Sequence, residues 1–401
     1  MNELKPPSTG ETSANGGEQK LPRKTFIQRF WWIGLIIILV VLLVGFVLIP
    51  KKNQRNDSDN SLAETKTEET NNRKVDVKFT QRIFDPEKVS HITPLGEING
   101  GYEEAQTING VMINIKTDAN RNANPIEVYA PTDMTLEDYS YFPDSRSNIP
   151  AQWHLGFRIS EDVKLSFDHL SSVPDNIKAV TPQTANSGYV PPAEKLSFKA
   201  GDRIATTSGT EQAHNWNIYL RDNRKTNTFV NQERYEKLKD RYDFINAVCP
   251  FDYYDDVQKN LYIALMGYSE AGESKTCGSN SKDVKGSISG LWHLNREGVQ
   301  ADYRGAYATP FSIYKASSNE IIIYEINKKR FIISDKNSTY KDPASITGSH
   351  CYNLTEYGDS KNTLGYVYFK VISDTEMKMS YSASGNCPAS FPDTNSQTYY
   401  R

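Results

Sequence analysis

Six histidines and four cysteines are the residues with which this chain would perform metal or nucleophilic chemistry. His169 and His214 lie in the segments LSFDHL and AHNWNIYL, whose short alternating patterns are typical of β-strands. A neutral imidazole binds zinc, and a histidine beside a metal-activated water can also transfer protons. The sequence contains no G-x-S-x-G elbow and no P-loop, so serine-hydrolase and nucleotide-binding chemistry are not supported.

All four cysteines lie in the C-terminal part of the chain, at Cys249, Cys277, Cys351 and Cys387. An even number in one compartment favours two disulfides, and Cys249–Cys277 with Cys351–Cys387 is the simplest of the three pairings. Four free buried thiols are the alternative. His350 adjoins Cys351, but a catalytic pair must meet in space, so sequence adjacency alone does not support a cysteine nucleophile.

Four segments between about residues 95 and 224 stand in a characteristic order: PIEVYAPTDMTL, LSFDHLSSV, FKAGDRIATTSGT and AHNWNIYL. They are similar to a P-V-Y-A-P-A-D-G-T-V turn, a Y-x-H-L segment, a V-x-x-G-D-x-I-G-x-x-G-x-T-G loop and an H-x-H-F strand. With this order the region resembles the lysostaphin-type (LytM-like) zinc peptidases, which cut peptide crosslinks in bacterial cell walls. The resemblance implies a β domain of the sandwich or barrel-sandwich hybrid type.

The resemblance also implies where a metal would bind. In the family, an H-x-x-x-D pair and the second His of H-x-H hold zinc, and an open position activates water. Here the pair falls on Asn114 and Asp118, and the H-x-H strand gives Asn215 and Asn217. An amide oxygen is neutral and a weaker ligand than imidazole, so we expect no zinc and no other cofactor.

The remaining histidines leave two alternatives open. His169 matches the family's H-L histidine, and without an activated water we expect it to be a structural remnant. His214 would become a ligand only in a shifted register, which would turn the strand's side chains to the opposite face. His91 and His154 would complete a different metal site with His169, although lone strand histidines more often make hydrogen bonds.

An uncharged apolar run precedes all of these segments. Residues 30–50 read FWWIGLIIILVVLLVGFVLIP, and a helix of this length extends about 31 Å, which matches a bilayer core. The run is too long for a signal peptide and no small-residue cleavage site follows it, so we expect a transmembrane helix. The polar segments 1–29 and 51–74 predict a disordered cytoplasmic tail and a flexible linker.

Orientation rests mainly on the cysteines. Positive charges are nearly balanced on the two sides of residues 30–50, so the positive-inside rule gives only weak support for either orientation of the helix. All four cysteines follow the apolar run, and disulfides form in extracytoplasmic compartments. We therefore expect a single-pass protein of the cell membrane with its N-terminus in the cytoplasm and its C-terminal domains outside.

Beyond the linker, the sequence predicts a mostly β protein. Residues 75–228 consist of short alternating runs broken by Pro, Gly, Asn and Asp, which predicts an all-β domain. Residues 229–245 and 254–267 have apolar positions at helical spacing and predict short linking helices. The rest of 229–401 alternates again and predicts a small β-barrel or sandwich, in which Gly290-Leu291-Trp292 resembles the G-x-W opening strand of lipocalin-like barrels.

Two polar patterns in the C-terminal part have ordinary explanations. Asp252, Asp255 and Asp256 form an acidic group that suits a helix N-terminus better than a cation site. Asn337-Ser338-Thr339 and Asn353-Leu354-Thr355 are glycosylation sequons, which matter only in a host that modifies them.

The functional hypothesis combines these observations. Lys and Arg (46) nearly balance Asp and Glu (49), so no field favours nucleic acid. Conserved block order with lost ligands predicts a membrane-anchored protein that binds or scaffolds at the envelope, with wall peptides or a wall hydrolase as partner. The resemblance supplies a precedent, since degenerate relatives activate wall amidases. One alternative is a zinc endopeptidase with His169, His214 and Asp118 as a rearranged site. The other is a glycan- or lipid-binding receptor acting through the C-terminal β domain.

Overall fold

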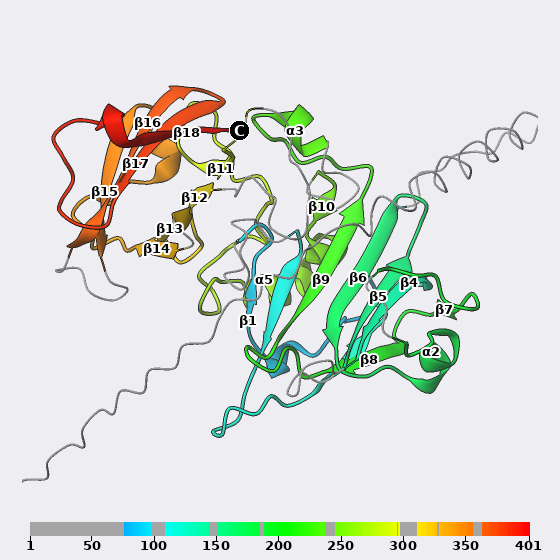
Figure 1. Ribbon diagram of the computed structural model, residues 1–401. Helices are drawn as coiled ribbons and strands as arrows, with labels where there is room; N and C mark the ends of the chain where they lie inside the picture. Colours follow the sequence, from blue (N-terminus) through cyan, green and yellow to red (C-terminus); the bar gives the residue numbers. More distant parts are fainter. Residues whose placement is uncertain are drawn as a thin grey trace, which may run out of the picture. The chain divides into compact units, whose positions relative to one another are not determined.

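The computed structural model describes residues 76–97, 109–143, 151–184, 188–236, 245–294, 296, 311–326, 329–355 and 363–401. The predicted tail 1–29, membrane span 30–50 and linker 51–74 lie outside the described residues. Among the helices of the described ranges, none has the length and apolar character needed to cross a membrane. The described part is mostly β, with several antiparallel sheets and few helices (Figure 1), as the sequence predicts.

The first half is built on an eight-stranded antiparallel sheet (Figure 1). Its strand order is β1 (Val89–Thr93), β2 (Val111–Ile115), β9 (Asn215–Asp222), β6 (Val163–Leu170), β5 (Gln152–Arg158), β4 (Met134–Phe142) and β7 (Ser197–Phe198), and β10 (Ala247–Val248) also pairs with β9. A separate two-stranded sheet is formed by β3 (Ile126–Tyr129) and β8 (Arg203–Thr207). The segments that alternation predicts as strands, VMINIKT, PIEVYAP, WHLGFRIS, VKLSFDHL, DRIATTS and NWNIYLRD, form β2, β3, β5, β6, β8 and β9. The strands β1, β4, β7 and β10 are additions.

Alternation along the strands gives the large sheet one apolar face. Phe167 on β6 and Trp216 and Ile218 on β9 are fully buried, and they pack in one core with residues from the N-terminal segment near Phe84. The residues between them in sequence point to the opposite face, because successive side chains of a strand alternate. This second face carries the candidate functional residues.

Helices are short in the described residues: α2 (Asp175–Val180), α3 (Gln232–Glu236) and α5 (Asp256–Ile263), with 3₁₀ turns η1 (Pro86–Lys88), η2 (Pro250–Tyr253), η3 (Pro343–Ser345) and η4 (Asp393–Asn395). Of the predicted helix 229–245, α3 is described, and 237–244 lie outside the described residues. The predicted helix 254–267 is realised as α5. Asp255 is its N-cap and accepts a hydrogen bond from the Gln258 amide at 2.9 Å, which explains part of the acidic group.

The segment after β9 belongs to the first core. Buried side chains between residues 247 and 277, including Phe251 and Tyr262, pack with the large sheet. Cys249 and Cys277 form a disulfide with 5.9 Å between their Cα atoms. The predicted domain border between residues 228 and 229 stays a prediction. Residues 247–277, which follow this border, contribute to the first core as well as linking the two halves.

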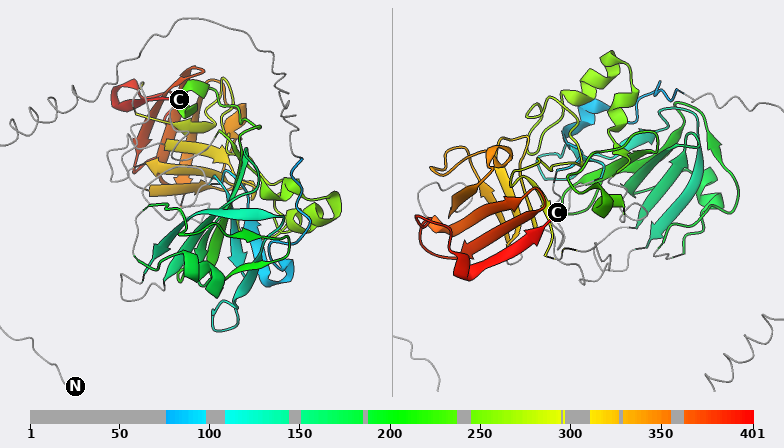
Figure 2. Two further views of the ribbon diagram at one scale, coloured as in Figure 1. Left: turned by 90° about the vertical axis from the view of Figure 1, so that its right-hand side faces the viewer. Right: turned by 90° about the horizontal axis from the view of Figure 1, so that it is seen from above.

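The C-terminal half contains two four-stranded antiparallel sheets (Figure 2). The first is β11 (Gly290–Trp292), β12 (Phe311–Lys315), β13 (Ile321–Ile326) and β14 (Lys329–Ile333), and the second is β15 (Ser349–Thr355), β16 (Thr363–Ser373), β17 (Glu376–Ser382) and β18 (Ser396–Tyr400). Both sheets contribute to one core. Of the predicted barrel or sandwich, the two-sheet arrangement is therefore the one observed.

Trp292 lies inside this core and is fully buried. Its indole nitrogen donates to the Ile288 carbonyl at 2.9 Å. A pair of backbone hydrogen bonds between His293 and Tyr400 joins the start of the first sheet to the end of the second. Apolar side chains from both sheets fill the space between them. The lipocalin-like resemblance of Gly290–Trp292 stays a prediction.

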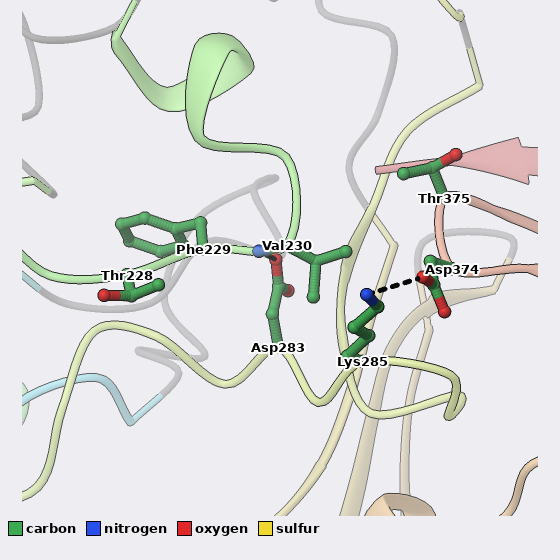
Figure 3. A pocket seen from close by; sticks show the side chains of 7 residues that line it. All are labelled: Thr228, Phe229, Val230, Asp283, Lys285, Asp374 and Thr375. Carbon is green, nitrogen blue, oxygen red and sulfur yellow. Dashed lines mark hydrogen bonds and ion pairs between the residues drawn. The ribbon is translucent and has the colours of Figure 1, made fainter.

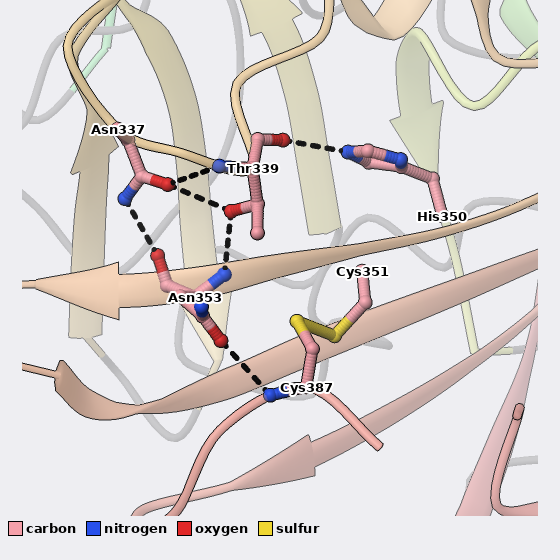
Figure 4. Close-up of a disulfide and its surroundings, with 6 residues drawn as sticks. All are labelled: Asn337, Thr339, His350, Cys351, Asn353 and Cys387. Carbon is pink, nitrogen blue, oxygen red and sulfur yellow. Dashed lines mark hydrogen bonds between the residues drawn. A yellow bond between two sulfur atoms is a disulfide. The ribbon is translucent and has the colours of Figure 1, made fainter. Parts of the chain in front are cut away.

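A second disulfide, Cys351–Cys387, holds the segment after β17 against β15 (Figure 4). The Asn353 side-chain oxygen accepts a hydrogen bond from the Cys387 amide at 2.9 Å. Asn337 donates to the Asn353 carbonyl at 2.9 Å and accepts from the Thr339 hydroxyl at 2.7 Å. Both sequon asparagines therefore make hydrogen bonds within the fold, and Asn337 is buried.

One buried carboxylate connects the two halves of the compact unit formed by residues 73–401. Glu97 is 3% exposed, and its Oε2 accepts a hydrogen bond from the Tyr314 hydroxyl at 2.9 Å. Lys282 Nζ lies 3.9 Å from Glu97 Oε1 and 4.9 Å from the centre of the Tyr314 ring. Burial lowers the pKa of Lys282, and the Glu97 carboxylate opposes that shift.

His293 gives a testable pH dependence. Burial, aided by the positive charge of Arg234, lowers its pKa from 6.5 to about 3. Between these two pKa values the unfolded chain binds a proton that the folded chain does not. The contribution of the neutral His293 to the free energy of unfolding is therefore fully present above pH 6.5 and is lost as the pH falls below it. Between pH 7.5 and 5.5 we expect this group to remove about 1.4 kcal/mol from the free energy of unfolding.

Denaturant unfolding of the wild-type chain and the His293→Leu variant at both pH values measures this loss. The difference in the free energy of unfolding between pH 7.5 and 5.5 should be about 1.4 kcal/mol smaller in the variant, because leucine does not titrate. An equal pH dependence in both proteins would show that folding does not lower the pKa of His293.

Candidate functional site on the polar face of the first sheet

Strand pairing places the family-matched asparagines on one face of the sheet. Asn114 on β2 lies opposite Asn215 on β9, and Asn217 lies between Met112 on β2 and Asp168 on β6. Paired residues in neighbouring strands project to the same side. Their neighbours in the chain are buried in the core, so this is the opposite, polar face of the sheet.

Two of these amides are held by hydrogen bonds within the chain. Asn114 Nδ2 donates to the Thr93 hydroxyl at 3.2 Å. Asn215 Oδ1 accepts from the Thr210 hydroxyl at 2.9 Å, and its Nδ2 lies 3.1 Å from the sulfur of Met112. The Asn114 amide therefore links β2 to β1, and the Asn215 amide links β9 to the preceding turn and to β2.

Asp118 occupies a different setting, in an exposed turn that follows β2. Its Oδ1 accepts from the backbone amides of Asn122 and Asn120, each at 2.8 Å, and its Oδ2 accepts from the Asn122 side chain at 3.3 Å. The hydrogen bonds from Asn122, with that from Asn120, lower the pKa of Asp118. This carboxylate caps the turn.

His169 adopts a left-handed backbone conformation with φ of 61°. Such a conformation is unfavourable for a residue with a Cβ atom, and its neighbours hold it in place. Its carbonyl accepts from the Thr207 hydroxyl at 2.6 Å, and its amide donates to Asp168 Oδ1 at 2.8 Å. The imidazole Nδ1 lies 2.7 Å from Gln152 Oε1. The side chain is therefore oriented by Gln152.

His214 lies just before β9, in a turn with φ of 50°. Its amide donates to the Thr210 carbonyl at 2.8 Å, and its carbonyl accepts from the Ile115 amide at 2.9 Å. The register therefore places Asn215 and Asn217, and not His214, on the strand between β2 and β6.

The histidines do not converge on one point. No three His, Cys, Asp or Glu side chains within the described ranges lie close enough to hold one metal ion. This applies to His91, His154 and His169, and equally to the rearranged set of His169, His214 and Asp118. His91 lies on β1 opposite Asn114 of β2, and its Nδ1 is 3.2 Å from the Ser90 hydroxyl.

A different group of residues does converge, around Asp168. His154 Nδ1 lies 3.9 Å from Asp168 Oδ1, and the Tyr189 ring centre is 4.6 Å from that of His154. Asn217 lies opposite Asp168 on β9, and Tyr219 follows on the same face. We call these five residues the Asp168 cluster.

The protonation states in the Asp168 cluster follow from burial. Burial lowers the pKa of His154, although Asp168 raises it, so the imidazole is neutral at neutral pH. Burial also raises the pKa of the Tyr219 hydroxyl well above its usual value, and the charge of Asp168 raises it further. Asp168 thus provides the negative charge among neutral side chains.

Sequence analysis did not single out Asp168, although a signal was present. In VKLSFDHL, Lys164, Ser166 and Asp168 alternate with three buried apolar residues. This pattern assigns Asp168 to the polar face. The proximity of His154 depends on an irregularity between β5 and β6, where the register shifts between Trp153 and Leu155, and sequence alone does not predict it.

Two pockets lie away from the polar face. One, of about 420 Å³, is lined by Thr228, Phe229, Val230, Asp283, Lys285, Asp374 and Thr375 (Figure 3). Its carboxylates are engaged: Asp283 accepts from the Val230 amide at 3.3 Å, and Lys285 Nζ lies 3.4 Å from Asp374. The other, of about 430 Å³, is lined by Asp76, Val77, Asp222, Arg224, Lys225, Asp252 and Tyr253. Neither pocket is lined by Asn114, Asp118, His169, Asn215 or Asn217, the residues that the sequence resemblance aligns with the peptidase site.

Comparison with solved structures gives a match of low structural similarity. A chain from a structure titled "Structure of the SpoIIQ-SpoIIIAH pore forming complex" aligns with a TM-score of 0.27 and 11% sequence identity. The alignment covers 45% of this chain and 92% of that one. No protein-family model matches the sequence, and no curated protein matches it.

The backbone at His169 can be tested through Thr207. The Thr207 hydroxyl is buried, donates to the His169 carbonyl and accepts from the Gly209 amide at 2.9 Å. Thr207→Val leaves both groups without this partner, so we expect a loss of about 1–3 kcal/mol in the free energy of unfolding. Denaturant unfolding measures the loss. Thr206→Val, which keeps both bonds, is the control, and equal stabilities of the two variants would contradict the assignment.

Proposed function

We propose that the chain is an envelope protein, anchored in the cell membrane by residues 30–50, whose polar face binds peptides of the bacterial wall or a wall hydrolase. It holds its partner without cleaving it. The anchoring segment and the orientation come from the sequence, and the binding role comes from the chemistry of the polar face.

The observation that carries this proposal is the set of bonds made by the family-matched residues. Asn114 and Asn215 are committed to neighbouring threonines, and Asp118 caps a turn. Replacing an imidazole with a bonded amide removes a strong zinc ligand and leaves a hydrogen-bonding surface. A rigid sheet with a polar face suits recognition of an extended peptide, because its side chains stand at regular spacing.

Binding and cleavage can be separated with purified bacterial wall sacculi. We expect the full chain in detergent micelles to sediment with sacculi and to release no soluble wall peptides. His169→Ala should leave both results unchanged, because the imidazole has no activated water to serve. Release of peptides that is lost in His169→Ala would overturn the proposal in favour of the zinc endopeptidase.

A matched pair of bulky substitutions locates the binding surface. Met112→Trp obstructs the polar face beside Asn217, and we expect it to reduce sedimentation at least severalfold. Lys378→Trp places the same side chain on β17 of the C-terminal half and should have little effect. The reverse result would favour the glycan- or lipid-binding receptor.

Orientation is tested by protease protection in intact cells stripped of their wall. Protease added outside should cut the linker 51–74 and release a fragment that contains both disulfides. The N-terminal tail 1–29 should be protected until the membrane is permeabilised. Protection of the C-terminal fragment in sealed cells would show that the domains lie inside.

A further inference from the structure

We infer that the Asp168 cluster is a binding site for a primary ammonium group carried by a peptide. This deepens the proposed function, since it names the chemical group that the polar face recognises. The inference rests on two buried polar atoms that lack a hydrogen-bond partner among the described residues, on the carboxylate between them, which has no ion-pair partner of opposite charge there, and on an exposed aromatic ring beside them.

The charge of Asp168 has no cationic counterpart in the described part of the chain. No lysine or arginine there forms an ion pair with it, and its nearest charged-type neighbour is the neutral imidazole of His154. Its side chain is 28% exposed, so water screens it only in part. Its Oδ1 accepts a hydrogen bond from the His169 amide at 2.8 Å, but a partly buried carboxylate without a cation beside it is costly, and a bound cation relieves that cost.

Two further acceptors lie on either side of this carboxylate. His154 is 6% exposed and its Nδ1 makes no hydrogen bond to the described residues. Asn217 is also 6% exposed, and its Oδ1 is buried without a partner there. Buried polar atoms are normally paired, so two orphans beside one carboxylate indicate a missing group.

The missing group must donate hydrogen bonds and carry positive charge. An ammonium group has three donors and no acceptor, which matches a carboxylate, an amide oxygen and a neutral imidazole nitrogen. The Tyr189 ring, with 68% exposure and 4.6 Å from the His154 ring, adds an aromatic face to which a cation is attracted. A phosphate or carboxylate would instead be repelled by Asp168.

Calorimetric titration of the full chain in detergent micelles with three synthetic peptides tests this site. Acetyl-Gly-Gly-Lys-Gly-Gly-amide carries a side-chain ammonium, Gly-Gly-Gly-Gly-Gly-amide carries a terminal one, and acetyl-Gly-Gly-(acetyl-Lys)-Gly-Gly-amide carries none. We expect at least one of the first two to bind, which identifies the source of the ammonium, and the third to bind at least tenfold more weakly. Failure of both ammonium peptides, or equal binding of the acetylated one, would overturn the inference.

Two variants tie the binding to the cluster. Asp168→Asn should weaken binding about tenfold or more, because a charge-assisted hydrogen bond is lost. Asp175→Asn, at a 98% exposed carboxylate on α2, is the control and should bind normally. Tyr189→Leu removes the exposed aromatic ring, and it should weaken binding severalfold. Equal affinities of Asp168→Asn and Asp175→Asn would contradict the assignment.

Failure of the ammonium site can be distinguished from failure of the proposed binding function. If sacculi sediment with the chain while no ammonium peptide binds, the binding role stands and the assignment of Asp168 falls. If Asp168→Asn lowers the affinity for both sacculi and peptide, the two proposals are supported together.

Discussion

The antiparallel register of β2, β9 and β6 is the constraint on which the first half of the molecule depends. It fixes which side chains of each strand enter the core, and so it also fixes which ones face outward together. Phe167 and Trp216 fill the inner side, while Asp168 and Asn217 meet on the outer side. A shift of one residue in any of these strands would exchange the two sets.

This division separates the side chains that stabilise the sheet from those that face outward. The large apolar side chains that stabilise the sheet lie on the inner face and are untouched when outer residues change. Asn114 and Asn215 lie on the outer face, opposite each other on β2 and β9. The local bonds of Asn114 and Asn215 then stabilise the neighbouring strand and loop. The polar face and the apolar core are therefore formed by opposite sides of the same strands.

Much of the architecture could be predicted because alternation is a local property. VKLSFDHL and NWNIYLRD predict the strands that become β6 and β9, and the even cysteine count favours the disulfides observed. β15 and β18 were not predicted, since SHCYNLT and SQTYY contain few apolar residues. The Asp168 cluster was also missed, because the approach of His154 depends on a register shift between strands. Such a shift is a tertiary property that spacing within one segment does not reveal.

The Cys249–Cys277 disulfide has a mechanical consequence for a chain held at one end and loaded at the other. The bond spans 28 positions of sequence at the point where the segment returns to pair with Leu95. Under tension those residues cannot be drawn out, which removes about 90 Å of extensible length at ~3.4 Å per residue. Load applied beyond Cys277 then passes through the sulfur atoms to Cys249, and both cysteines belong to the first core. Force applied to the C-terminal sandwich would therefore reach the large sheet through a short, inextensible path.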